Sequence, residues 1–114
     1  MSTPLERAMI DEGPYIYYED SFRNVIEDHL PWLRTSERTQ ARPLEPAVAM
    51  RNNFDLYTLL LEMNIAPHLH WTIMRMNGYT SPEQFTADVT ALMIPDTGDM
   101  ETLRATFMTI HKIR

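Results

Sequence analysis

The sequence of 114 residues lacks cysteine entirely and holds only three glycines. Without cysteine, the chain has no disulfide bond, no thiolate nucleophile and no zinc site with sulfur ligands. Three glycines are too few for a glycine-rich loop that binds phosphates. The chain also lacks an apolar run of membrane-spanning length, and it lacks a charged N-terminal segment followed by an apolar run. We therefore expect no membrane partner, and synthesis in a cytoplasm without a classical export signal.

Basic residues are in the minority, with 10 lysines and arginines against 16 acidic residues and a formal net charge of −6. This balance argues against a polyanion as the main partner, so we expect no nucleic-acid partner. An acidic inhibitor that mimics nucleic acid stays open as an alternative. Such an inhibitor needs carboxylates clustered at phosphate-like spacing, whereas the acids of this chain are scattered and interrupted by arginines.

Candidate catalytic and metal-binding residues are also scarce. His68 and His70 are two positions apart, and on a helix such residues point in different directions, so they could share a metal only on a strand. No Ser-His-Asp grouping has the context of a nucleophile elbow. We therefore expect no catalytic residue, no metal, no cofactor and no small-molecule ligand. The function of a non-enzymatic protein must be sought in what it binds.

The residues that are present suffice for one domain with a modest core, since 44% of the chain is hydrophobic. We divide the chain into an N-terminal extension (1–45), a core (46–96) and a C-terminal helix (97–114). Within the extension we expect a short helix over about 4–11, an extended tyrosine-rich run, an amphipathic helix from Ser21 that Pro31 stops or bends, and a basic connector. Asp99 is expected to cap the C-terminal helix.

Aromatic and basic residues of the extension are candidates for partner contacts. The tyrosine-rich run either faces a partner or covers the core of the domain, because tyrosine suits both surfaces. Arginines spaced four apart lie on one face if the connector is helical. If it is a loop, as the prolines favour, they form a basic arm or simply a solvated connector. The candidate partner-binding residues are Tyr15, Tyr17, Tyr18, Trp32, Arg34, Arg38 and Arg42.

Charge is unevenly distributed along the chain. Residues up to Asp20 contain one arginine and five acidic residues, whereas arginines dominate the stretch that follows, from Arg23 to Arg51. An acidic front and a basic middle would suit head-to-tail association between copies of the chain.

The core segment contains signals for both strands and helices. We expect a short strand around Val48 and Met50, a turn at Asn52-Asn53, a buried helix over about 56–64, and a second helix from Pro67 that Gly78 ends. The sequence Ser-Pro-Glu-Gln at 81–84 predicts another helix over 82–91. A closing strand within 91–95 is the alternative for the end of that stretch.

An ordered set of positions runs through the core segment. Its members are Pro67, Leu69, Trp71, Asn77, Pro82, Ile94 and Pro95. Over about residues 48–96, this spacing resembles the LysM-like module of small baseplate proteins of contractile-tailed bacteriophages, notably the wedge proteins that initiate baseplate assembly. That module has a helix pair between short strands. The chain departs from it where LysM domains usually carry glycine, since those places hold Asn or Phe before the first helix and Asp88 or Val89 before the closing strand.

The resemblance implies a helix-dominated α+β fold, with a small LysM-like helix-pair core, short strands, and helical or extended terminal extensions. It also implies a multi-copy structural protein of the virion tail or baseplate, made in the host cytoplasm, whose partners are other virion structural proteins and copies of itself. A glycan-binding LysM-type protein is the alternative, in which Trp71 and Tyr57 would present their ring faces to a sugar.

Overall fold

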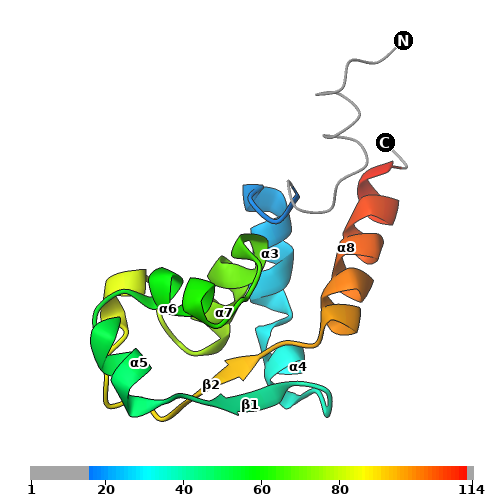
Figure 1. Cartoon of the computed structure of the whole chain (residues 1–114). Helices are drawn as coiled ribbons and strands as arrows, with labels where there is room; N and C mark the ends of the chain where they lie inside the picture. Colours follow the sequence, from blue (N-terminus) through cyan, green and yellow to red (C-terminus); the bar gives the residue numbers. More distant parts are fainter. Residues whose placement is uncertain (1–15, 113–114) are drawn as a thin grey trace.

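The computed structural model describes residues 16–112 of the chain, with side chains described as far as Thr109. The fold is helix-dominated α+β with one two-stranded antiparallel sheet, as expected from the sequence (Figure 1). The elements in order are α3 (Asp20–Asp28), α4 (Leu30–Thr35), β1 (Gln40–Pro43), α5 (Pro46–Arg51), α6 (Leu56–Glu62), η1 (Pro67–Leu69), α7 (His70–Met76), η2 (Pro82–Gln84), β2 (Ala91–Ile94) and α8 (Thr97–Lys112). The helix expected over 4–11 lies outside the described residues.

The sheet joins two segments that are far apart in the sequence. Gln40 of β1 lies opposite Ile94 of β2, and Pro43 lies opposite Ala91. Residues 40–43 of the basic connector form a strand, so the expectations of a helix or a loop were both wrong for this part of it. The boundary drawn at residue 45 falls between β1 and α5, and each side of it contributes one strand.

Two further predictions in the core segment were wrong. Residues 46–51 form helix α5 and not a strand, because Pro46 stands at the helix start, where its fixed φ favours helix and its missing N–H costs no bond. The helix predicted over 82–91 is only the single turn η2, after which Phe85 is extended and completely buried. Burial of Phe85 overrides the local capping signal, and the alternative of a closing strand is confirmed by β2.

The two central helices are confirmed. Asp55 caps α6, since its carboxylate accepts a hydrogen bond from the Thr58 amide (3.2 Å). Helix α7 follows the turn η1, which begins at Pro67. Just after the helix, Gly78 has φ +85°, a left-handed conformation that glycine adopts without strain. Pro31 does not end a helix, because α3 ends at Asp28 and Pro31 lies in the first turn of α4.

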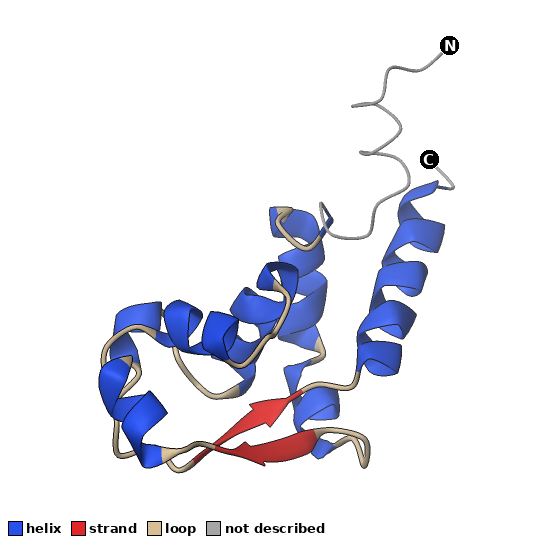
Figure 2. Ribbon diagram, in the orientation of Figure 1, coloured by secondary structure: helices blue, strands red, loops and turns tan. Residues whose placement is uncertain are grey.

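The buried apolar side chains form two clusters. The terminal cluster comprises Ile16, Tyr17, Phe22, Ile26, Leu30, Leu33, Met76, Met100, Leu103 and Phe107. The sheet cluster comprises Ala49, Leu56, Leu59, Leu60, Ile65, Ile73, Met74, Phe85, Leu92 and Ile94. Figure 2 shows the same division, with α5 and α6 to one side, α3, α4 and α8 to the other, α7 between them and the two strands at the base.

Helix α7 and strand β2 contribute side chains to both clusters. Ile73 and Met74 belong to the sheet cluster, whereas Met76 belongs to the terminal cluster. On β2, Leu92 and Met93 point to opposite faces, because successive residues of a strand alternate, and Met93 packs against the terminal cluster. The side chains therefore hold the two halves of the molecule together through one helix and one strand.

Helix α8 packs beside α3 although the two lie at opposite ends of the sequence (Figure 1). The prediction that Asp99 caps this helix was wrong. The Asp96 carboxylate accepts from the Asp99 amide (3.2 Å), so Asp96 takes the capping role. Asp99 itself is in the first turn and is completely buried.

Candidate partner-binding surface

The residues of the core motif gather around α7 and β2. Pro67 and Pro82 open the two single turns η1 and η2. Leu69 and Trp71 are half-buried and pack against both clusters. Ile94 and Pro95 are buried at the end of β2. The motif residues thus contribute mainly to internal packing.

Asn77 has a specific structural role at the outer edge of β2. Its side-chain amide donates to the Met93 carbonyl (3.0 Å), and its side-chain oxygen accepts from the Met93 amide (2.8 Å). A third bond runs from the same amide group to the Ile73 carbonyl (2.7 Å). The Asn77 side chain therefore pairs with β2 as a neighbouring strand would, and ties it to α7.

The tyrosines of the extension divide between core and surface. Tyr17 is only 3% exposed and packs edge-on against Phe22, so the prediction that it faces a partner was wrong. Burial raises the pKa of its hydroxyl to about 12. Tyr18 and Trp32 are exposed at 52% and 40% and stay available for contacts. Tyr15 lies outside the described residues.

Arg34 is committed to the C-terminal end of α7. Its guanidinium donates to the Met76 carbonyl (2.9 Å) and the Arg75 carbonyl (2.8 Å). Both carbonyls lie in the last turn of the helix, where backbone acceptors lack partners within the helix. Arg34 therefore stabilises the fold and is no longer a good candidate for a partner.

Arg38 is also engaged within the chain. Its guanidinium donates to the buried Asp99 carboxylate at 2.5 and 3.1 Å, and the Ser36 hydroxyl donates to the same carboxylate at 2.6 Å. The Ser36 hydrogen bond, followed by the Arg38 hydrogen bond, lowers the pKa of Asp99 despite its burial. Together, Ser36, Arg38 and Asp99 connect the loop before β1 to the start of α8.

Arg42 differs from the other arginines whose side chains are described. Those at positions 23, 34, 38, 51, 75 and 104 each bond a carbonyl or a carboxylate. The exposed guanidinium of Arg42 has no hydrogen bond, ion pair or ring contact among the described residues. It lies in β1, between two surface hollows.

Five carboxylates of the described region are paired with arginines, those of Glu27, Glu62, Asp96, Asp99 and Glu101. Glu27 pairs with Arg75, and Glu101 pairs with Arg104 at 2.9 Å. Glu62 accepts from Arg51 (2.7 Å) and Asn52 (3.1 Å), and these bonds lower the pKa of Glu62 to about 2. These five are neutralised within the chain and so are not available to a nucleic-acid-binding protein, which weighs against the nucleic-acid mimic.

The two histidines of the His68-x-His70 pair point to separate neighbours. The ring of His68 contacts that of Tyr17 with centroids 4.7 Å apart, and burial lowers the pKa of His68. His70 is buried, and its Nε2 lies 2.9 Å from the Ile65 carbonyl. Within residues 16–109, no three side chains of the metal-ligating type come together.

Aromatic rings line a hollow of about 190 Å³ beside α7. Tyr18, Tyr57 and Trp71 border it together with Arg23. The Arg23 guanidinium lies 4.9 Å from the centre of the Trp71 ring, so it covers part of the face that a sugar would need. The hollow therefore brings Trp71 and Tyr57 together but leaves only part of their surface open.

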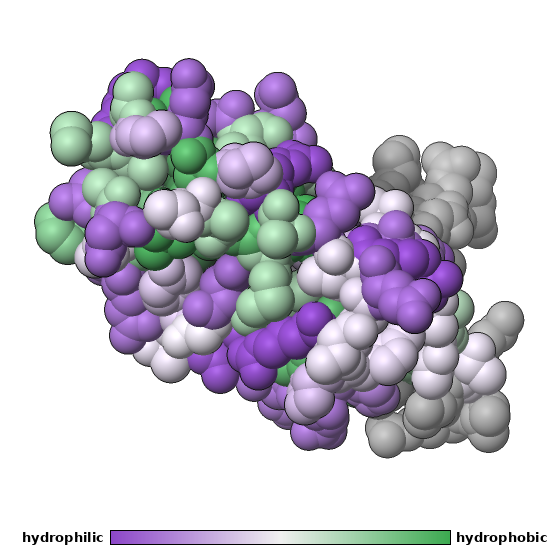
Figure 3. All heavy atoms as spheres, turned by 90° about the horizontal axis from the view of Figure 1, so that it is seen from below, coloured by the Kyte–Doolittle hydropathy of each residue, from purple (hydrophilic) through white to green (hydrophobic). Residues whose placement is uncertain are grey.

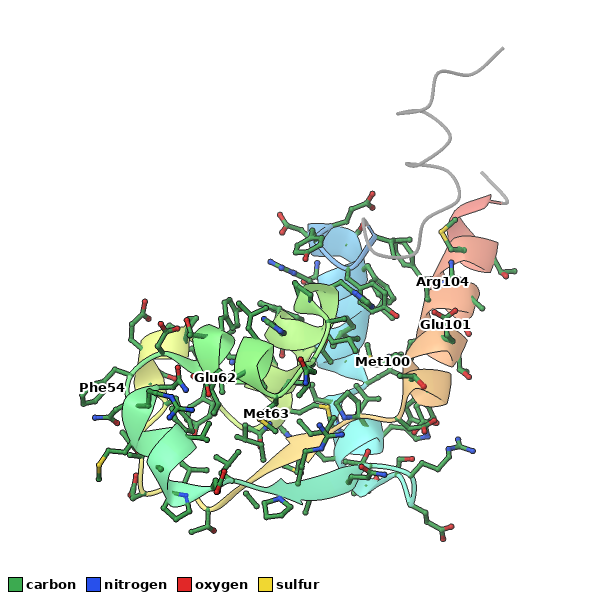
Figure 4. All side chains as sticks on the ribbon, in the orientation of Figure 1. Phe54, Glu62, Met63, Met100, Glu101 and Arg104 are labelled. Carbon is green, nitrogen blue, oxygen red and sulfur yellow. The ribbon has the colours of Figure 1, made fainter. Side chains whose placement is uncertain are left out.

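Three exposed apolar residues were not predicted from the sequence to be partner-binding residues. Met50, Phe54 and Leu61 are 72%, 58% and 54% exposed. Phe54 adopts φ +66°, a conformation that is unfavourable for a bulky side chain, and Figure 4 shows it at the edge of the molecule beside α5. The signal in the sequence was the phenylalanine itself, placed directly after an Asn-Asn turn, where LysM domains usually carry glycine.

Across the described residues, no helix combines the length and the apolar character needed to span a bilayer. Comparison of the chain with protein-family models, curated proteins and solved structures finds no match in any of the three. The function is therefore argued from the geometry of the chain itself.

Proposed function

We propose that this chain is a non-enzymatic structural adaptor of a contractile phage tail, positioned in the baseplate, where it docks neighbouring subunits. Residues 46–96 serve as a LysM-like docking block. The terminal extensions contact neighbouring copies and other virion proteins.

The pairing of β1 with β2 carries this proposal. The two strands lie on either side of α6 and α7 in the sequence and meet in one antiparallel sheet. A helix pair between short paired strands is the arrangement implied by the LysM-like resemblance. The first strand lies at 40–43, before the residues 48–96 that carry the resemblance, and α5 stands where the resemblance placed a strand. Phe54 has a left-handed backbone conformation where the module usually has glycine.

Exposed apolar side chains support a role in assembly. Tyr18, Trp32, Met50, Phe54 and Leu61 come from different elements and are all at least 40% exposed. Large apolar and aromatic side chains on a surface are typical of protein contacts. Their distribution over several elements suits a subunit that touches more than one neighbour through small interfaces.

The test is a stop codon within α6 of the gene in the phage that carries it, with lysates viewed by negative-stain electron microscopy. We expect filled heads without complete tails, and infectious particles restored by the intact gene supplied in trans. Mass spectrometry of purified wild-type particles should detect the chain. Complete, infectious particles formed without it would contradict the proposal.

A glycan-binding protein is the second candidate, and the aromatic hollow beside α7 favours it. Titration with chitin and peptidoglycan fragments should then quench tryptophan fluorescence in a saturable way, and Tyr57→Ala should weaken the response. If Arg23 blocks the Trp71 face, Arg23→Ala should strengthen binding. If the tryptophan fluorescence of neither the wild type nor Arg23→Ala changes in these titrations, this candidate is eliminated.

A further inference from the structure

The strand β1 and helix α5 border two adjacent surface hollows that meet at Arg42. One, of about 360 Å³, lies between β1 and the loop after α6, with Ile65, Leu69 and Ile94 among its lining residues. The other, of about 540 Å³, lies between the end of β1 and α5, with Leu44, Val48 and Met63 among its lining residues. We call the two hollows together the Arg42 groove. Figure 3 views the molecule from the side of β1 and α5 and shows apolar residues gathered on this face.

The groove offers a cation without an internal anion. Arg38 also lines it, but that side chain is bound to Asp99 and lies 3.7 Å from Asp96. Glu62 lines it too, and is held by Arg51 and Asn52. Glu45 lines the second hollow as well, without an ion pair among the described residues, and Arg42 is the cation of the groove without a described partner. A guanidinium between apolar walls favours a ligand with a carboxylate next to apolar side chains.

The edge of β1 limits the shape of such a ligand. The Leu44 amide donates to the Thr90 carbonyl (2.8 Å), and the Asn77 side chain occupies the far edge of β2. In this described sheet, the outer edge of β1 is therefore the edge open to another strand. Pro43 has no N–H to donate there, which prevents a long ladder. A short extended segment recognised mainly through its side chains fits this site best.

One segment of the chain has this chemistry. Residues 1–15 lie outside the described structure, and they contain the sequence Met-Ile-Asp-Glu at 9–12, in which two apolar residues precede two carboxylates. With Glu6, the segment has three acidic residues against the single Arg7. Its charge and its apolar residues complement the Arg42 groove.

The point where this segment joins the structure favours a second copy as the acceptor. Residues 16–17 are buried in the terminal cluster beside the start of α3, at the end of the molecule away from β1 (Figure 1). A segment leaving from there must pass around the body to reach its own groove. The groove of a neighbouring copy requires no such detour.

We propose that residues 1–15 of one copy bind in the Arg42 groove of the next, with Asp11 or Glu12 paired to Arg42. The proposal rests on the proposed function, because it names one partner of the multi-copy adaptor. The contact joins different surfaces of the two copies, so it generates a ring or an open row according to whether the rotation closes.

Sedimentation velocity on the full chain over a range of concentrations tests this contact. We expect reversible association that Arg42→Gln weakens by about tenfold or more, as for a charge pair with apolar surroundings. Asn24→Asp changes the net charge by the same one unit at an exposed position on α3 and should associate like the wild type. Circular dichroism verifies that each variant is folded.

A charge exchange gives a sharper result. Arg42→Glu alone and the pair Asp11→Lys with Glu12→Lys alone should each abolish association, and their mixture should restore it between unlike copies. A synthetic peptide of residues 1–15 should bind the wild type, compete with association and fail to bind Arg42→Glu.

Three results would overturn the proposal. They are a monomer at every concentration, association that Arg42→Gln leaves unchanged, and a mixture of the charge-exchanged variants that stays monomeric. If the chain is monomeric and its own residues 1–15 compete with the added peptide, the segment occupies the groove of its own copy. If the chain is monomeric but phage tails still require it, only the inference about residues 1–15 fails. If complete tails form without the chain, the proposed function fails, whether or not copies of the chain associate.

Discussion

The sheet cluster and the terminal cluster each bury ten of the described residues, yet the chain supplies them in different ways. The sheet cluster draws on one continuous stretch, residues 49–94, which β1 and β2 close. The terminal cluster joins residues 16–33 to residues 100–107, with Met76 as the contribution of α7. The first is built from neighbours in the sequence, and the second depends on bringing distant segments together.

This difference has an energetic consequence. Ordering distant segments costs more chain entropy than closing a local stretch, so we expect the terminal cluster to open at a lower free energy than the sheet cluster. Apolar packing in the terminal cluster offsets this cost, and the polar contacts of Arg34 with the end of α7 and of Arg38 with Asp99 add to this stabilisation. A sheet cluster that opens rarely, beside terminal helices that open more easily, suits a subunit that docks through the first and adjusts to its neighbours through the second.

Truncation of a buried phenylalanine in each cluster should have the largest effect. Phe85 and Phe22 are both completely buried, so Phe85→Ala and Phe22→Ala should each lower the free energy of unfolding by about 3–5 kcal/mol in urea titrations. Hydrogen exchange should distinguish the two variants. Phe22→Ala should leave the amides of α6 protected, whereas Phe85→Ala should lower the protection of amides around both clusters. Equal loss of protection at α6 in the two variants would remove the distinction between the clusters.

Asp99→Asn should weaken the attachment of the terminal cluster. Loss of the charge-assisted bonds from Ser36 and Arg38 should cost about 1.5–3 kcal/mol at pH 7. The pKa of Asp99 is lowered on folding, so its contribution is present above the ordinary value of 3.8 and is lost as the pH falls through the folded pKa. Urea titrations at pH 7, 4 and 2 should therefore show a smaller acid-induced loss for the variant. Parallel pH curves for both proteins would contradict this role.

Asn77→Ala should loosen the edge that the two clusters share. The variant leaves the Met93 amide and carbonyl without their partners, at a cost of about 1–3 kcal/mol. Asn24→Ala is the matched control, since Asn24 is exposed on α3 and should change stability by less than about 0.5 kcal/mol. Thermal unfolding measures both, and an Asn77 variant as stable as its control would show that water replaces the lost bonds.

Phe54→Gly should have the smallest effect, and in the opposite direction. Glycine accepts φ +66° without strain, so the variant should gain about 0.5–1 kcal/mol, while Phe54→Ala should not gain. Thermal unfolding should rank the two variants. A glycine variant that is less stable than the wild type would mean that the exposed ring contributes packing that outweighs its strained backbone.

The helices of the sheet cluster could be predicted from the sequence because their signals are local. Leu56, Leu59 and Leu60 recur at helical spacing, and Pro67 and Gly78 mark the limits of the next helix. The strand β1 could not be predicted in this way, since all four of its residues are exposed and show no alternation. Its formation depends on pairing with β2, about 50 positions later.

The candidate surface was only partly predictable for a similar reason. The spacing of Arg34, Arg38 and Arg42 marked a basic stretch, but the acceptors that occupy the first two lie 42 and 61 positions away. Tyr17 and Tyr18 are adjacent in the sequence and differ in exposure from 3% to 52%, which depends on how the start of α3 packs against α8. Such long-range pairings are decided by the fold as a whole.

Native-state hydrogen exchange on the full chain tests the central claim most directly. The account predicts that amides of α6 and α7 exchange only through global unfolding, whereas those of α3 and α8 exchange through a separate opening of lower free energy. Equal protection of α3, α8 and α6 across denaturant concentrations would contradict it, because the molecule would then be one cooperative unit without a separable terminal part.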